Sequence, residues 1–256
     1  MHYLNGSWVN SYASKMDLLV AEDGSIVGQY SSTTGSTGLY SVIGNCAPEV
    51  SSQEREGLAV VLSIYWHPVN SETRDESWHW VSTYCGQVLN NGELSVINSL
   101  VATSNFNGVS SGDYIDKLIF KKISNEFKPL AILSSEKIEK TMFSNPINGE
   151  WIGENPSAKL CLTVTNNRYG LVQGTADYQN TKIMFNGFTD TNIENLSLQS
   201  ISICGYMFDR DVPISLSGWL DLNSNSLQLS RWIANATTPD NVYYQSDVES
   251  WLLRKK

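Results

Sequence analysis

Long apolar runs, clustered cations and metal-type cysteine spacings are all missing from this chain of 256 residues. No run of about 18 apolar residues occurs, so we expect no transmembrane helix. Lys and Arg number 17 against 26 Asp and Glu. The net charge of −9 argues against nucleic acid or an anionic membrane as a partner, because both bind clustered cations. The N-terminal residues lead directly into the first motif, leaving no room for a signal peptide. We therefore expect a cytoplasmic protein, or a secreted one whose leader has been removed.

Recognisable catalytic and metal-binding patterns are missing too. The four cysteines show no C-x-x-C spacing, which disfavours a zinc site. No Gly-rich phosphate loop, nucleophile elbow or Cys–His pairing occurs, so we expect no enzyme and no cofactor. Five possible ligands lie in or beside one loop: His67, Glu72, Asp75, Glu76 and His79. They lack a regular ligand spacing, so we interpret this segment as a solvated loop with no metal.

Aromatic residues and alternating polar and apolar segments are abundant instead. Eight Trp and twelve Tyr exceed what a core needs, which fits β-structure and leaves some rings for a ligand pocket. Short alternating segments are separated by turn signals such as Asp23-Gly24. In the first half, after a strand at Trp8, the pattern predicts strands over 16–21, 25–30, 39–44, 58–66, 78–86, 94–102 and 114–123. In the second half, after a strand at Trp151, it predicts strands over 159–164, 170–175, 182–188, 200–208, 213–222, 226–234 and 248–254. Closing each such meander into a barrel removes its edges.

An internal duplication divides the chain. Asn5, Gly6 and Trp8 of the first half recur as Asn148, Gly149 and Trp151 in the second. This separation indicates a duplicated domain and not a short-period solenoid. We predict an all-β fold of two tandem eight-stranded antiparallel up-and-down β-barrels, over 1–124 and 148–256, joined by a linker over 125–147.

The first half resembles the avidin/streptavidin family of biotin-binding proteins over about residues 5–123. The shared positions are Gly6, Trp8, Asn10, Ser14, Asp23, Gly24, Gly28, Tyr30, Ser32, Tyr40, Gly44, Val60 to Trp66, Ser82, Tyr84, Gly86 and Gln87. The second half shares fewer, namely Gly149, Trp151, Ser157, Gly174, Ser217 and Gly218. The chain thus resembles a tandem of two avidin-like barrels of which the second is degenerate.

The resemblance implies that biotin enters the open end of the first barrel. In the family, residues matching Asn10, Ser14 and Tyr30 donate to the ureido oxygen, and the residue matching Ser32 accepts a ureido N–H. Ser82 matches the hydroxyl that faces the ring sulfur, and Trp66 and Tyr84 match aromatic walls. Thr34, Gly35 and Ser36 lie where a loop holds the carboxylate tail. These ten residues are the ligand-binding site that the resemblance implies.

The residues alone support this site only in part. Tyr30 and Ser32 are two apart in a strand and share one face. Asn10 and Ser14 flank a loop, where polar side chains can equally cap a turn, so both interpretations stay open.

Several positions depart from the family. Leu100, or Val101 if the register slips by one, stands where the family has a wall Trp. Leu118 replaces an Asp or Asn that accepts the second ureido N–H, and Trp80 replaces a small Ser. Losing such partners weakens binding, so we expect a weaker biotin binder or a different ligand.

The second barrel has lost other parts of the site. Gly153 and Ala176 stand at the positions of Asn10 and Tyr30, and Leu216 stands at that of Tyr84. Trp232 occupies the position of the wall Trp. We therefore expect a structural role for this barrel: it pairs with the first barrel in a dimer-like assembly or, by self-association of two chains, in a tetramer-like one.

These observations predict a non-catalytic small-molecule binding protein that takes biotin or a biotin-like ligand in its first barrel. The alternative is a degenerate scaffold that binds a glycan or a protein partner, in a defence, insecticidal or structural role.

Overall fold

The structure, a computed structural model, describes residues 2–32, 38–48, 57–69, 78–105, 110–126, 144–238 and 246–256. These residues contain no helix, and so none that could span a membrane.

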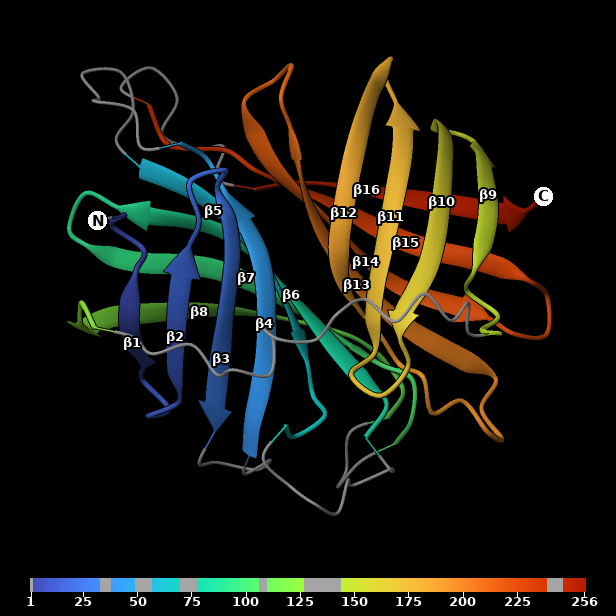
Figure 1. Ribbon diagram of the computed structural model, residues 1–256, viewed down its shortest axis with the longest axis horizontal. Helices are drawn as coiled ribbons and strands as arrows, with labels where there is room; N and C mark the ends of the chain where they lie inside the picture. Colours follow the sequence, from blue (N-terminus) through green and yellow to red (C-terminus); the bar gives the residue numbers. More distant parts are fainter. Residues whose placement is uncertain are drawn as a thin grey trace.

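Sixteen strands in the described residues form two closed barrels in tandem, as predicted. The first barrel contains β1 (Gly6–Asn10), β2 (Lys15–Val20), β3 (Ser25–Ser32), β4 (Gly38–Cys46), β5 (Gly57–Tyr65), β6 (Trp80–Leu89), β7 (Glu93–Ala102) and β8 (Gly112–Ser124). The second contains β9 (Gly149–Glu154), β10 (Ser157–Asn166), β11 (Leu171–Tyr178), β12 (Thr181–Thr189), β13 (Leu198–Met207), β14 (Val212–Asp221), β15 (Ser226–Ala234) and β16 (Ser246–Lys255). Each strand is antiparallel to the next, and the last pairs with the first. The barrels lie side by side, with the chain termini at opposite ends (Figure 1).

Local sequence explains the strands and their turns. In β3 the side chains alternate between buried and half-buried, as a strand with one face on a core requires. At the preceding turn Gly24 adopts a φ of 81°, which a residue without Cβ tolerates best. Asp23 Oδ1 accepts the backbone N–H of Ser25 at 3.0 Å and so fixes the turn. The Asp-Gly hairpin expected from the sequence is confirmed.

The duplicated motif forms the same structure in both barrels. The indole Nε1 of buried Trp8 donates to the carbonyl of Leu4 at 3.0 Å, and that of Trp151 donates to Ile147 at 2.9 Å. In addition, Asn5 Oδ1 and Asn148 Oδ1 each accept a backbone N–H at 2.7 Å, from Val20 and Val164. In each copy of the motif, the Asn and Trp side chains fix the first strand of the barrel by hydrogen bonds. This is a structural reason for the repeated residues.

The two barrels pack against each other through the outer faces of β4–β7 and β12–β15. Trp232 and Cys204 of the second barrel lie in one apolar cluster with Val61 and Cys85 of the first. A second cluster stacks Tyr65 on Phe188, with ring centroids 5.9 Å apart. The outward-facing positions of these strands are therefore a second core and not a solvated surface.

Buried hydroxyl groups join the strands at the centre of this interface. Ser202 Oγ lies 2.7 Å from Ser63 Oγ and 2.6 Å from Thr83 Oγ1. Ser63 Oγ also lies 3.1 Å from Cys204 Sγ. Each polar group thus has a partner, which removes most of the cost of burying it.

Ser63 and Cys204 occupy equivalent positions in the two barrels. Leu62 is paired with Gly44 in the first barrel, as Ile203 is paired with Gly187 in the second. Ser63 and Cys204 are the residues that follow Leu62 and Ile203. Because equivalent residues meet at this contact, the two barrels are related by an approximate twofold axis that passes near it.

One acid–imidazole contact crosses the interface. Nδ1 of His79 lies 2.6 Å from Oδ2 of Asp190, and both side chains are buried. Asp190 also accepts the backbone N–H of Asn192. His79 therefore joins the two barrels. Glu72, Asp75 and Glu76, considered beside it as ligands, lie outside the described residues. In the part of the chain that is described, no three His, Cys, Asp or Glu residues form a metal-binding group.

Candidate functional site

The amide of Asn10 caps a turn through its oxygen and directs its nitrogen toward Tyr30. Its Oδ1 accepts the backbone N–H groups of Tyr12 and Ser14, each at 3.0 Å, so it caps the turn after β1. Because two backbone donors fix the oxygen, the orientation of the amide is set. Its Nδ2 then points to the hydroxyl of Tyr30 at 3.5 Å, inside the barrel. The turn thus presents an N–H donor to the interior.

Three predicted donors lie together at this end. Asn10, Ser14 and Tyr30 are each at most 7% exposed, and Ser32 lies two residues beyond Tyr30 on the same face, 9% exposed. Thr34, Gly35 and Ser36, predicted to hold a ligand tail, lie outside the described residues.

Aromatic rings surround the ring of Tyr30. The Tyr30 ring centroid lies 5.4 Å from that of Trp66 and 6.3 Å from that of Tyr84, both edge to face. Phe120 of β8 adds a third ring, 6.4 Å from Tyr30. Burial, and then the neighbouring Tyr30, raise the pKa of Tyr84 well above its ordinary value. Tyr30 is 4% exposed and Tyr84 1%, and hydrogen bonds among such buried groups are stronger than those in water.

Ser82 and Trp66 contact each other directly. The indole Nε1 of Trp66 donates to Ser82 Oγ at 2.9 Å. The Ser82 hydroxyl, which the family resemblance predicts to face a ligand, thus already accepts a hydrogen bond. A ligand that uses Ser82 must exchange this bond or share the oxygen.

The register settles which residues of β7 face the interior. Leu94 and Val96 belong to the core of the first barrel, and Leu100 shares their face. Val101 faces outward and packs between the barrels, so the alternative register is wrong. Leu118, 7% exposed, lies inside the barrel as expected.

A polar row that the sequence analysis missed lies between these leucines. Asn98 is the cross-strand partner of Tyr84 on one side and of Asp116 on the other. Its Oδ1 is buried, and no described residue donates a hydrogen bond to it. The missed signal is an amide on a face that is otherwise apolar. β7 thus places a buried acceptor in the barrel interior that no described side chain or backbone group satisfies.

Two stacked indoles, Trp78 and Trp80, continue the group of aromatic rings around Tyr30. Trp80 lies parallel to Trp78, with centroids 6.0 Å apart and planes at 6°. Trp78 in turn stacks on Tyr40, which contacts Trp66. The bulky Trp80 predicted in place of a small residue is therefore packed against other rings. Trp78 and Tyr40 were not predicted as part of the site.

The interior of the second barrel is filled differently. Ala176 and Leu216 belong to its apolar core, as their residue types suggest. The interpretation of Trp232 as a wall of this interior is wrong, because its ring faces the first barrel. Side chains alternate along a strand, so the neighbour Arg231 is the residue that points inward with Leu229 and Ile233.

Arg231 is the centre of a polar network inside the second barrel. Its guanidinium is 2.9 Å from Asp247 and 3.1 Å from Glu249. Glu249 also accepts hydrogen bonds from Tyr178 at 2.9 Å and Trp251 at 3.0 Å. These mutual contacts occupy the groups that would otherwise face a ligand, so the first barrel holds the better candidate site.

Comparison with known proteins does not assign the chain to a family. No family model matches the chain, and no curated protein matches it.

Proposed function

We propose that the protein is a non-catalytic binding protein that takes biotin, or another cyclic urea, in the interior of its first barrel. The observation that carries this proposal is the fixed orientation of Asn10. Its oxygen is held by the turn, and its Nδ2 is held toward Tyr30 within an aromatic enclosure. Donors fixed in advance around one point suit a urea oxygen, because the ligand does not have to organise them.

The opposite wall supports the same ligand class and limits its affinity. Asn98 Oδ1 is buried and receives no hydrogen bond from the described residues, and a urea N–H would satisfy it. Leu100 and Leu118 flank Asn98 on the same face and provide apolar contact only. The Trp66–Ser82 hydrogen bond must also be exchanged or shared when a ligand enters. We therefore propose weaker binding than in typical avidins.

Titration calorimetry with biotin tests the proposal. We expect one site per chain in the wild type, because the second barrel has its own polar network inside. Tyr30→Phe removes one hydroxyl and leaves the ring in place. A lost hydrogen bond in a dry site costs about 1–3 kcal/mol, which is roughly a 5- to 150-fold loss of affinity. Asn10→Ala should lose at least as much, because it also removes the cap of the turn.

Tyr178→Phe is the matched control, because it removes a buried tyrosine hydroxyl from the other barrel. It should leave biotin affinity unchanged. Absence of heat and of any thermal shift with the wild type at high biotin excess would refute the proposal. A stoichiometry of two would contradict the assignment to the first barrel alone.

A further inference from the structure

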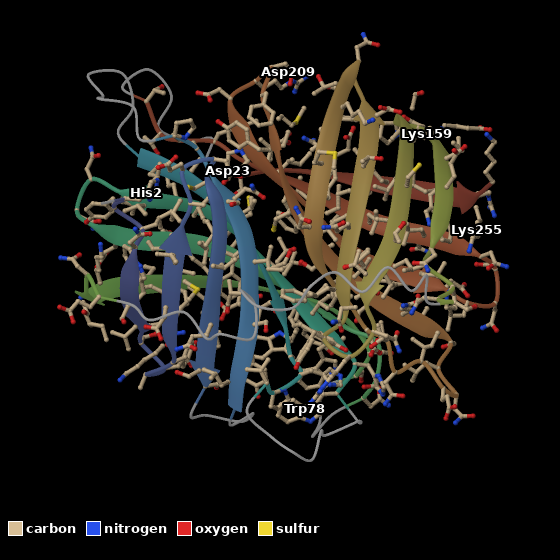
Figure 2. All side chains as sticks on the ribbon, in the orientation of Figure 1. His2, Asp23, Trp78, Lys159, Asp209 and Lys255 are labelled. Atoms are coloured by element: carbon tan, nitrogen blue, oxygen red, sulfur yellow. The ribbon has the colours of Figure 1, made fainter. Side chains whose placement is uncertain are left out.

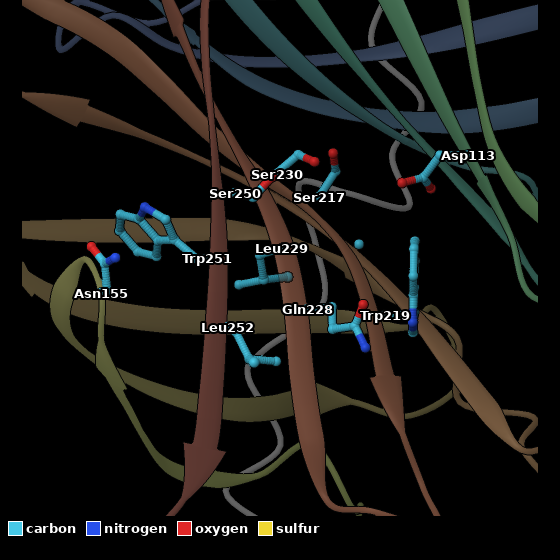
Figure 3. A pocket seen from close by; sticks show the side chains of 11 residues that line it. Asp113, Asn155, Ser217, Trp219, Gln228, Leu229, Ser230, Ser250, Trp251 and Leu252 are labelled. Atoms are coloured by element: carbon cyan, nitrogen blue, oxygen red, sulfur yellow. The ribbon is translucent and has the colours of Figure 1, made fainter.

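A groove of about 370 Å³ opens where the two barrels part. Its floor is the outer face of β14, β15 and β16, and Asp113 of β8 contributes from the first barrel (Figure 3). Trp232 lies on the same outer face of β15 but is covered by the first barrel, so the groove begins where that contact ends. Small-molecule sites occur preferentially at such junctions, in cavities of roughly 300–1,000 Å³.

The strand register arranges the floor as two rows of side chains. One row consists of Ser217, Ser230 and Ser250, which are successive cross-strand partners. The other consists of Trp219, Gln228 and Leu252, two residues further along the strands and on the same face. Neighbouring strands lie about 4.8 Å apart, so each row is closely spaced. The floor thus combines a line of hydroxyls with an indole, an amide and an aliphatic side chain.

The indole of Trp219 has a polar group at either end. Figure 3 shows the carboxylate of Asp113 beyond one end of the ring and the amide of Gln228 beside the other. Trp219 is half-buried, packed below against the interface cluster of Tyr65 and Phe188. Its position is therefore fixed by packing while part of the ring faces the groove.

Asp113 is an exposed carboxylate that lines the groove. No described residue forms a hydrogen bond or an ion pair with its side chain. Neighbouring groups cover part of the side chain, and this partial burial raises the pKa of its carboxyl to about 6. It is the one titratable side chain among the described residues that line the groove. A ligand that brings donors would satisfy it.

We propose that this groove binds a neutral glycan, with a sugar ring lying on Trp219 and its hydroxyls bonded to Asp113, Gln228, Ser230 and Ser250. A pyranose has one apolar face of C–H groups and a rim of hydroxyls that both donate and accept. The floor matches both parts, since a planar ring adjoins groups of both hydrogen-bonding types. This site is separate from the barrel interior and does not depend on biotin binding.

Other ligand classes fit the lining less well. No Lys, Arg or His among the described residues lines the groove, so an anion has no counter-charge there. An organic cation would find one carboxylate and the indole of Trp219. Trp251, the other indole of the lining, packs in the core of the second barrel, so the groove lacks the several aromatic faces that enclose such ligands in an aromatic cage. A cation would form no hydrogen bond with the Gln228 amide or the hydroxyls of Ser230 and Ser250, whereas a sugar can bond to all three.

The test is binding of the intact chain to immobilised neutral oligosaccharides, followed by calorimetry with the strongest of them. We expect specific binding that persists when biotin is present in excess. Asp113→Asn removes the negative charge at an exposed position and should weaken binding about tenfold or more, as does loss of a charged hydrogen bond. Gln228→Ala, also exposed, should weaken it severalfold. Neither change disturbs the core.

Asp177→Asn is the matched control, because Asp177 is an exposed strand carboxylate of β11 that does not line the groove. It should bind as the wild type does. Failure to bind any neutral oligosaccharide overturns the proposal. So does binding that is unchanged in both Asp113→Asn and Gln228→Ala. Binding of tetramethylammonium, lost in Asp113→Asn and without any sugar binding, would identify a cation site instead.

Discussion

Trp232 is the residue whose removal best tests how the two barrels are joined. Its ring is 5% exposed and packs with Val61 and Cys85 of the first barrel, while its Nε1 donates to Ser217 at 3.1 Å. Trp232→Ala therefore opens a cavity between the barrels and not inside one. Trp251→Ala is the comparison, because that indole is equally buried but belongs to the interior of the second barrel.

The expected loss follows from the size of the side chain. Truncating a buried Trp to Ala costs about 3–5 kcal/mol, as lost transfer free energy plus the cavity that remains. In a chain of this length, 1 kcal/mol changes Tm by about 2–4 °C. Trp232→Ala should therefore lower Tm by roughly 6–20 °C. Trp251→Ala should lower it by a similar amount, so Tm alone does not separate the two positions.

The thiol of Cys85 separates them, because it lies in the same interface cluster as Trp232. Burial raises the pKa of this thiol to about 12 in the intact protein, which makes it unreactive toward a thiol reagent at neutral pH. In Trp232→Ala the cluster loosens, and Cys85 should react measurably faster under native conditions. In Trp251→Ala it should stay protected. Equal protection in both variants, or a Tm within about 2 °C of the wild type for Trp232→Ala, would refute the placement of this ring.

Two further predictions concern titratable groups. Burial alone would raise the pKa of Glu249, but hydrogen bonds from Trp251 and Tyr178 and the charge of Arg231 hold it below its ordinary 4.5. Such a group stabilises the fold at pH values above 4.5 and loses this contribution as pH falls through the lower folded pKa. Glu249→Gln should therefore flatten the acid limb of stability against pH in chemical denaturation; an unchanged limb would contradict this. Burial also raises the pKa of Cys204 to about 12, so Cys85 and Cys204 should stay unmodified in a native thiol titration and react after denaturation, and prompt native modification would contradict their burial.

The fold could be predicted because local signals agreed along the whole chain. Alternation marked the strands, Asp23-Gly24 marked a hairpin, and the repeat of Trp8 as Trp151 marked the second barrel. Each signal acts over a few residues. Closure of the barrel then follows from pairing each strand with its neighbour in the sequence and the last strand with the first.

The candidate site was predicted less completely, because the strand register decides whether a side chain points into the barrel or out of it. The alignment placed Trp232 one residue away from the inward-facing position of Arg231. A residue assigned to the barrel interior therefore belongs to the interface between the barrels. The same parity settled Leu100 against Val101. Asn98 was missed because a single amide in an apolar strand gives no sign of its partners. The groove at Asp113 was beyond prediction, since its walls come from different barrels.

The contact between Ser63 and Cys204 has a consequence for how such a pair of barrels can change over time. In a dimer of identical chains, a residue at the twofold axis meets its own copy, so every substitution there occurs twice. Two cysteines at that point could oxidise to each other, and two serines would have to share their hydrogen bonds. Here one chain carries both positions, so a hydroxyl can meet a thiol at 3.1 Å. Each half can be altered independently, and dilution cannot separate them.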